Sequence, residues 1–291
     1  MRLDDLPESS NVSDNRGMRT AGGIAAGGGG LLLLILGLVF GIDTGKLGIG
    51  GRPSSGPPPN DNYRQFAGKV LGTLERVWEK EFDDPANRYG RVRFEPPKLV
   101  LFSDEVNTAC GRAPSAVGPF YCPGDRTIYL DPTFFDELES KLGGSKSQFT
   151  QAYVIAHEFG HHVQNLLGYS GLVDQHRGRP DELQYSVRLE LQADYLAGVW
   201  AYHGQKEFNF IEAGDIESAI KSAQAIGDDR LQTRSGGFPH PEKFSHGTSR
   251  QRVLAFKSGF QTGDATKAKL DRFFSAQFNP RTGEIDDSAF R

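Results

Sequence analysis

Five consecutive residues, His157-Glu158-Phe159-Gly160-His161, carry side chains that could bind a metal ion and move a proton. On a helix, histidines four residues apart lie one above the other, with Cβ atoms about 5–6 Å apart. Two imidazoles at this spacing can hold one ion, and the glutamate beside the first can accept a proton from a water that the ion polarises. The motif therefore indicates a metal site with Glu158 as the general base.

A surface helix with two solvated histidines is the alternative interpretation, and the surrounding pattern argues against it. Apolar or small residues recur at spacings of three and four through this segment, which is typical of an amphipathic helix: Phe149, Tyr153, Ala156, Gly160, Val163 and Leu167. Residues 145–148 resemble a capping box, and Gly168 is a suitable helix end. Gly160 would let another backbone approach the helix closely. His162 lies too far round the helix to bind the same ion, so we expect it at the surface or supporting the site.

The third metal ligand must come from a different element, because a catalytic zinc normally has three protein ligands and one open position. Glu190 and Asp194 share one face of a second helix, expected from Asp181 to about Tyr202. Carboxylates on such an apolar helix need partners. We predict Glu190 as the third ligand and Asp194 as the acceptor that fixes a ligating histidine. Three residues compete as third ligand, with a solvated surface position as the alternative: Asp174, His176 and Glu182.

The remaining elements indicate an α+β fold that is mainly helical and has a small sheet. Helices are predicted for residues 61–82, 131–138, 215–226, from 248 or 249 to 256, and 265–274, and strands for residues 98–102 and 126–131. Residues 169–180 are expected to form a loop. The strand over residues 126–131 is our candidate edge strand for an extended substrate.

The amino-terminal part of the chain differs in kind from the rest. Residues 20–42 contain no charged side chain and are long enough to cross a bilayer core of about 30 Å, so we predict a transmembrane anchor there. A signal peptide is the alternative, although no good cleavage site follows Phe40. Residues 1–19 are predicted to be disordered, residues 43–60 to form a Gly/Pro/Ser linker, residues 61–278 to form the folded domain and residues 279–291 a polar tail. Arginines before the span favour a cytoplasmic amino terminus and an extracytoplasmic domain.

Composition and cysteine usage narrow the class of protein. The chain has 291 residues and a formal net charge of −4, with basic and acidic residues well mixed. It therefore shows no cluster of basic residues that would indicate nucleic-acid binding. Its two cysteines, Cys110 and Cys122, flank a Gly- and Pro-rich loop that a disulfide could close. Such a bond implies an oxidising compartment. Two unpaired buried thiols are the alternative, and a cysteine zinc site lacks the usual close spacing.

These motifs together resemble a family. His157 and His161 with Glu190-x-x-x-Asp194 look like the gluzincin pattern of zinc peptidases, and the whole chain resembles the putative neutral zinc metallopeptidases of bacteria. The resemblance rests on several separate segments: residues 1–5, 11–12, 16–17, 156–164, 190–194, 245–249 and 251–252, and the apolar span. It implies a zincin-like, membrane-anchored peptidase in which Asp194 contacts His157. It also implies that His246 faces the substrate, where it could stabilise an oxyanion. Arg252 could pair with a carboxylate near the site or simply pack its helix. A helix-entry or core position is the alternative for His246. His203 and His240 are expected to be structural or exposed.

The function that follows is Zn²⁺-dependent hydrolysis of a peptide or protein substrate at a bacterial membrane. A non-catalytic envelope scaffold stabilised by zinc is the second hypothesis, and it predicts a fourth protein ligand such as His176 or His246. Hydrolysis of another amide, for example in cell-wall peptide, is the third hypothesis and ranks below general proteolysis, because the sequence shows no recognisable wall-binding module. Substrate and oligomeric state cannot be predicted from these residues.

Overall fold

The computed structural model describes residues 1–17, 61–234 and 237–291. The predicted transmembrane anchor at residues 20–42 and the linker at residues 43–60 lie outside these ranges. Within them, no helix combines the length and the apolar composition that crossing a bilayer requires. The described chain is mainly helical with small sheets, as the sequence predicts.

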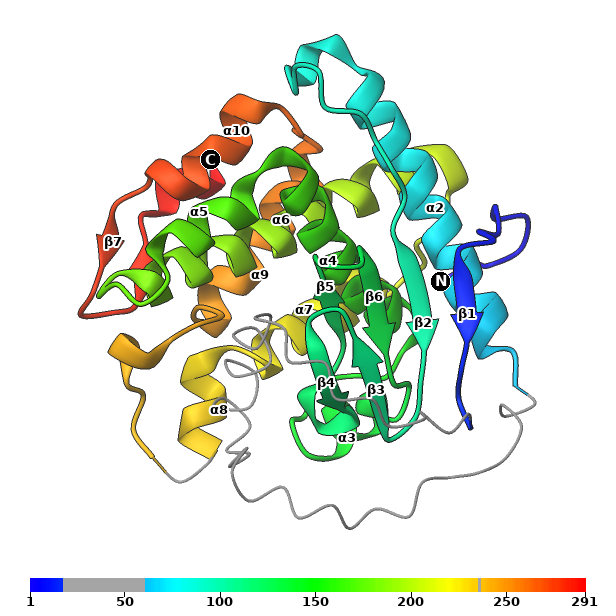
Figure 1. Cartoon of the computed structure of the whole chain (residues 1–291), viewed down its shortest axis with the longest axis horizontal. Helices are drawn as coiled ribbons and strands as arrows, with labels where there is room; N and C mark the ends of the chain where they lie inside the picture. Colours follow the sequence, from blue (N-terminus) through cyan, green and yellow to red (C-terminus); the bar gives the residue numbers. More distant parts are fainter. Residues whose placement is uncertain (18–60, 235–236) are drawn as a thin grey trace.

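Figure 1 shows the elements in chain order. The strands are β1 (Val12–Asp14), β2 (Lys98–Leu101), β3 (Glu105–Thr108), β4 (Gly111–Pro114), β5 (Phe120–Cys122), β6 (Thr127–Leu130), β7 (Phe278–Asn279) and β8 (Glu284–Ile285). The helices are α2 (Tyr63–Asp83), α3 (Phe134–Ser140), α4 (Gln148–Leu167), α5 (Tyr169–His176), α6 (Glu182–Phe208), α7 (Asp215–Ala225), α8 (Asp228–Arg234), α9 (Ser249–Thr262) and α10 (Lys267–Ser275). Helix α5 replaces the predicted loop because Tyr169 stacks on Phe274 of α10, a contact that local sequence does not reveal.

The main sheet has four strands in the order β1-β2-β6-β5. Strands β1, β2 and β6 are parallel, and β5 runs antiparallel to β6. The prediction of residues 126–131 as an edge strand is therefore wrong, because β6 lies between β2 and β5. The terminal strand beside the motif helix is β5, which packs against α4.

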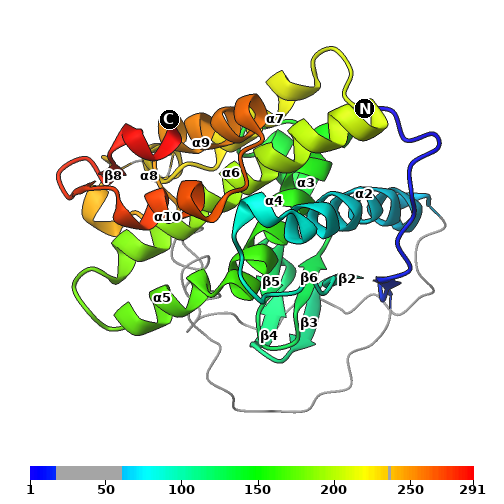
Figure 2. The same ribbon diagram turned by 90° about the horizontal axis from the view of Figure 1, so that it is seen from above.

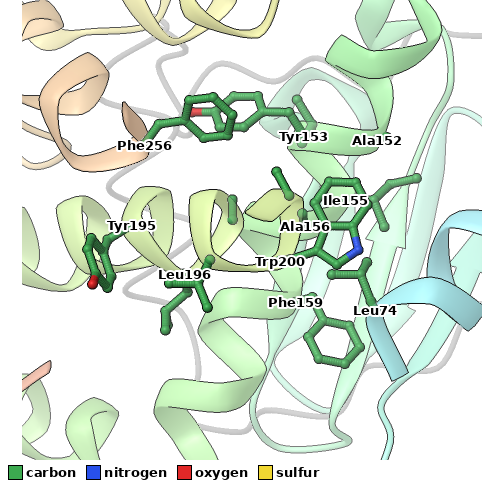
Figure 3. Close-up of a cluster of buried hydrophobic side chains, with 14 of the residues drawn as sticks. Leu74, Ala152, Tyr153, Ile155, Ala156, Phe159, Tyr195, Leu196, Trp200 and Phe256 are labelled. Atoms are coloured by element: carbon green, nitrogen blue, oxygen red, sulfur yellow. The ribbon is translucent and has the colours of Figure 1, made fainter. Parts of the chain in front are cut away.

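Helices α2 and α4 lie between this sheet and helix α6 (Figure 2). Figure 3 shows the apolar contacts that join α4 to α6 and α9. The ring of Tyr153 meets Phe256 edge-on with centroids 5.2 Å apart, and Ala156 faces the part of α6 that carries Leu196 and Trp200. These side chains are almost fully buried, so the relative placement of the three helices is set by a packed core.

Gly160 controls how closely α4 and α6 approach each other. A Cβ atom at this position would lie 3.1 Å from the carbonyl oxygen of Ala193 and 3.2 Å from its Cα. The missing side chain thus admits the α6 backbone next to the motif, as the sequence predicts. Because Ala193 lies between Glu190 and Asp194, this contact brings both carboxylates to the histidines.

The structure corrects the predicted domain limits at both ends of the chain. Residues 1–17 are not disordered: β1 pairs with β2, and Val12 and Arg16 are buried. Residues 279–291 are not a free polar tail, because Ile285, Ala289 and Phe290 are buried against the domain. Both ends are held by strand pairing or by burial of a few apolar side chains. Their largely polar composition did not predict these contacts.

Cys110 and Cys122 form the predicted disulfide, which joins the turn between β3 and β4 to the end of β5. We expect the Cys110→Ser/Cys122→Ser variant to lose about 3 kcal/mol of unfolding free energy, since a loop of this size is constrained in the unfolded chain. Urea unfolding of both proteins measures this difference. A reductant should lower the midpoint of the wild type and leave that of the variant unchanged; equal midpoints without reductant would contradict the prediction.

Candidate metal centre

Three side chains from two helices converge at one point. His157, His161 and Glu190 each offer one ligand atom, and these atoms lie within 4.8 Å of one another. His157 Nε2 is 3.1 Å from Glu190 Oε2, and His161 Nε2 is 3.4 Å from Glu190 Oε1. All three residues are buried. The structure therefore brings together the three residues that the sequence predicts as ligands.

The start of helix α4 is well defined, which sets the angular position of both histidines. The Ser147 side chain accepts a hydrogen bond from the backbone N–H of Thr150, and Gly168 ends the helix in the left-handed conformation. The histidine rings then lie 4.8 Å apart at nearly a right angle. Since the helix cannot rotate without moving its buried face, both rings are held on the side that faces α6.

Hydrogen bonds at Nδ1 orient both rings. His157 Nδ1 lies 2.8 Å from Asp194 Oδ1, and a carboxylate can only accept, so this nitrogen donates. His161 Nδ1 lies 2.8 Å from Gln164 Oε1. With both Nδ1 atoms occupied, the two Nε2 atoms face Glu190. Two imidazole nitrogens and one carboxylate oxygen are a donor set that suits zinc.

Asp194 is the centre of a buried polar cluster. Arg252 donates to it from Nε (2.8 Å) and Nη2 (3.0 Å), and Tyr153 donates from its hydroxyl at 2.5 Å. Burial alone would raise the pKa of Asp194, but the charges of Arg252 and His157 outweigh it and lower this pKa to about 2. Asp194 is therefore ionised and can fix His157, as the sequence predicts, and Arg252 acts through it. Tyr153 is a partner that sequence reasoning missed.

The two histidines have pKa values shifted in opposite directions. Burial lowers the pKa of His157, yet the carboxylates of Asp194 and Glu190 more than reverse this and raise it to about 10. Burial dominates at His161 and lowers its pKa to about 4. Burial also raises the pKa of Glu190, but His161 and His157 bring it well below the usual range. Without an ion, a proton on His157 thus offsets the Glu190 carboxylate, and a divalent cation would replace it.

Gln164 is a second partner that sequence reasoning missed. Its Nε2 donates to the carbonyl of Leu189 (2.7 Å) and to Oε1 of Gln192 (3.0 Å). These bonds turn its Oε1 toward His161. Gln192 in turn donates to the carbonyl of Leu270 on α10 (2.9 Å). The chain of amides links α4, α6 and α10 and holds His161 in one tautomer. Only the spacing of three residues from His161 hints at this role.

We expect Gln164→Leu to weaken zinc binding about 10- to 100-fold, as the loss of such supporting hydrogen bonds typically does. The Kd can be measured by competition with a chromogenic chelator. Asn165→Leu is the matched control on the same helix, since its amide donates to Tyr121 and does not contact His161. Equal affinities for the wild type and Gln164→Leu would contradict a positioning role.

Glu158 lies beside the ligands and is also buried. Burial, assisted by the Glu190 charge, raises the pKa of its carboxyl to about 8, although His157 partly offsets this. The backbone of Tyr121, on strand β5, lies close enough to the carboxylate to lower this pKa slightly. A carboxyl group with a pKa near neutrality can both accept and release a proton.

Burial would lower the pKa of His246, but its hydrogen bond to Asp228 and the nearby charge of Glu190 raise this pKa instead. Asp228 holds the residue: its Oδ1 is 3.2 Å from His246 Nδ1, and its Oδ2 accepts the backbone N–H of His246 at 2.7 Å. Asp228 gives no sequence signal beyond its position at a helix start. Because Nδ1 faces Asp228, the second ring nitrogen is left for another partner.

The other histidines and competing ligands lie outside the cluster. His162 is buried rather than at the surface, donating from Nε2 to the Glu95 carbonyl and facing the Tyr121 hydroxyl. His176 stacks on Tyr185 and contacts Asp181. The remaining residues have other partners: Asp174 pairs with Arg177, Glu182 accepts from Gly178, His203 contacts Gly263 and Glu81, and exposed His240 contacts Glu242.

Helices α4 and α6 present an HExxH motif and a third carboxylate at one point, which is the arrangement typical of HExxH zinc sites. The family model described as Putative neutral zinc metallopeptidase matches residues 1–273, so the chain belongs to this family, as the sequence motifs indicate.

Two bacterial relatives are similar over much of the chain. Uncharacterized protein YpfJ of Escherichia coli strain K12 is 42% identical over 285 residues, covering 91% of this chain and 96% of the relative. Uncharacterized protein Rv2575 of Mycobacterium tuberculosis strain H37Rv is 46% identical over 177 residues, covering 58% and 60%. No solved structure matches this chain.

Proposed function

We propose that this protein is a zinc-dependent peptidase in which His157, His161 and Glu190 bind the ion and Glu158 is the general base. The observation that carries the proposal is the three-donor cluster with Glu158 directly beside it. Among the described residues this cluster has no fourth protein donor, which favours a catalytic site over a closed structural one. The family assignment supports zinc peptidase activity at the family level.

The chain's own residues supply the proton transfers. Zinc, when bound, lowers the pKa of a coordinated water and polarises the scissile carbonyl. Glu158 accepts the proton of the attacking water and passes it to the leaving amine. Asp228 orients His246 and helps to raise its pKa, which favours the doubly protonated ring. In that form His246 could donate a hydrogen bond from Nε2 to the developing oxyanion of the substrate. Asp194, Arg252 and Gln164 keep the ligands in place.

An extended peptide substrate could pair with strand β5, the terminal strand of the main sheet. The backbone of Tyr121 on this strand lies near Glu158, so a peptide at this edge would pass close to the base. Strand addition of this kind provides affinity through main-chain hydrogen bonds.

The scaffold hypothesis is less well supported. It needs a fourth ligand, and both candidates have other partners. His176 stacks on Tyr185 with ring centroids 3.6 Å apart, and the Nδ1 of His246 faces Asp228. Neither histidine belongs to the group of converging donors among the described residues.

We also propose that the domain works outside the cytoplasm. The disulfide between Cys110 and Cys122 supports this location, because such bonds persist in oxidising compartments.

The full chain, purified in detergent, provides the test. We expect one zinc per chain by mass spectrometry and cleavage of some members of a peptide library. Removal of zinc with a chelator should abolish cleavage, and added zinc should restore it. Stoichiometric zinc without cleavage of any peptide or protein would rule out the peptidase and retain the metal site.

A further inference from the structure

Residues 1–17, which we call the amino-terminal segment, form part of the folded domain. Strand β1 pairs in parallel with β2 in the register Val12↔Leu99, Ser13↔Val100 and Asp14↔Leu101. Figure 1 shows this strand, in blue, beside β2 and α2. The family match begins at residue 1 and so includes the segment together with the metal centre.

Helix α2 has a surface that fits the segment closely. A Cβ atom at Gly72 would lie 2.3 Å from the carbonyl oxygen of Pro7, so only glycine allows this approach. One turn earlier, the carbonyl of Gly68 accepts a hydrogen bond from the backbone N–H of Ser9 at 2.9 Å. Two glycines four residues apart thus form a shallow groove on α2 that the segment fills.

Arg16 connects the end of the segment to the residue where the described chain resumes. Its guanidinium donates to both carboxylate oxygens of Asp61, each at 2.8 Å, and to both oxygens of Asp14, at 2.9 and 2.6 Å. Arg16 is buried, whereas the Asp61 side chain is 45% exposed, and the bidentate geometry gives two charge-assisted hydrogen bonds between them. Residues 16 and 61 are therefore fixed side by side.

This contact restricts how the chain meets a membrane. Residues 20–42 are the apolar stretch, and one passage through a bilayer would separate its two flanks by about 30 Å. Such a separation cannot coexist with a contact of 2.8 Å between Arg16 and Asp61. We propose that the amino-terminal segment and residues 61–291 lie on the same side of the membrane.

The proposal replaces the expected topology, in which a cytoplasmic amino terminus and an extracytoplasmic domain flank a single span. It does not rest on the proposed function, because His157, His161, Glu190 and Glu158 all lie outside the segment. Loss of peptidase activity would leave it intact, and a failed topology test would leave the peptidase intact.

Labelling of single cysteines tests the topology. Ser10→Cys places a thiol on an exposed position of the segment, and Lys221→Cys places one on the exposed face of α7. Full-length variants in spheroplasts are treated with a membrane-impermeant maleimide before and after lysis, and the unsubstituted chain gives the background. We expect both sites to react in the same sample, either both before lysis or both only after it. Reaction of one site before lysis and of the other only after lysis would overturn the proposal.

A designed cross-link tests the docking itself. Ser13→Cys/Val100→Cys joins register partners, whereas Ser13→Cys/Ser103→Cys moves the second thiol by about 10 Å along the strand direction, beyond disulfide reach. In the full chain in native membranes, we expect the first pair to cross-link at least about 10-fold more than the second, as detected by mass spectrometry of linked peptides. Equal yields from the two pairs, in protein that still binds zinc, would show that the segment is not docked.

Discussion

Glu158→Gln is expected to lower kcat for peptide hydrolysis at least about 100-fold, because general acid–base groups typically contribute about 10²–10⁴ to the rate. The amide has the same shape as the carboxyl but cannot accept the proton of the attacking water. Burial raises the pKa of Glu158 to about 8, so the neutral amide also resembles the form that the fold favours without an ion. We therefore expect the variant to fold normally.

Metal analysis separates chemistry from binding in this variant. Glu158 lies outside the group of three ligand atoms, so zinc stoichiometry should stay unchanged. Glu217→Gln, on the exposed face of α7, is the matched control and should keep full activity. A Glu158→Gln protein that holds zinc and retains more than a tenth of the wild-type rate would exclude Glu158 as the base.

Asp194→Asn is expected to weaken zinc binding about 10- to 100-fold and to cost about 3–5 kcal/mol of unfolding free energy. The amide oxygen can still face His157, but its NH₂ group cannot accept a hydrogen bond from Arg252. The buried guanidinium then loses the charge that compensates it. Removal of one partner from a buried ion pair is costly because the other charge stays desolvated.

A double-mutant cycle identifies the source of that loss. Arg252→Gln should also destabilise the protein, and Asp194→Asn/Arg252→Gln should lose clearly less than the sum of the single variants, since no buried charge is left alone in this pair. Unfolding is measured on metal-free protein and zinc affinity by chelator competition. Additive free energies, or an Asp194→Asn variant with wild-type zinc affinity, would show that Asp194 does not link Arg252 to the metal site.

The ligand set could be predicted because it depends on local helical spacing. His157 and His161 are one turn apart, and so are Glu190 and Asp194, and a turn of helix brings such pairs to one face wherever the helix lies. Gly160 added a further clue, since a residue without a side chain inside an apolar helix suggests a close neighbour. The mainly helical class followed from the same periodicity.

The supporting residues could not be predicted in the same way. Gln164, Tyr153 and Asp228 act through contacts with residues far away in sequence, and a single glutamine, tyrosine or aspartate has no pattern that names its partner. The expected edge strand was wrong for a related reason. The pattern at residues 127–130 identifies a strand, but the order of strands depends on which segments pair with it, and β5 carried too weak a signal to be placed beside it.

The sequence by itself determined the candidate metal donors, since residue types at a spacing of four on two helices define them before any fold is known. Only the tertiary structure decided which groups orient those donors, and where the amino terminus lies. The physical reason is that side-chain periodicity is a local property. The contact of Arg16 with Asp61 and the buried contact of Asp194 with Arg252, by contrast, join residues that only the folded chain brings together.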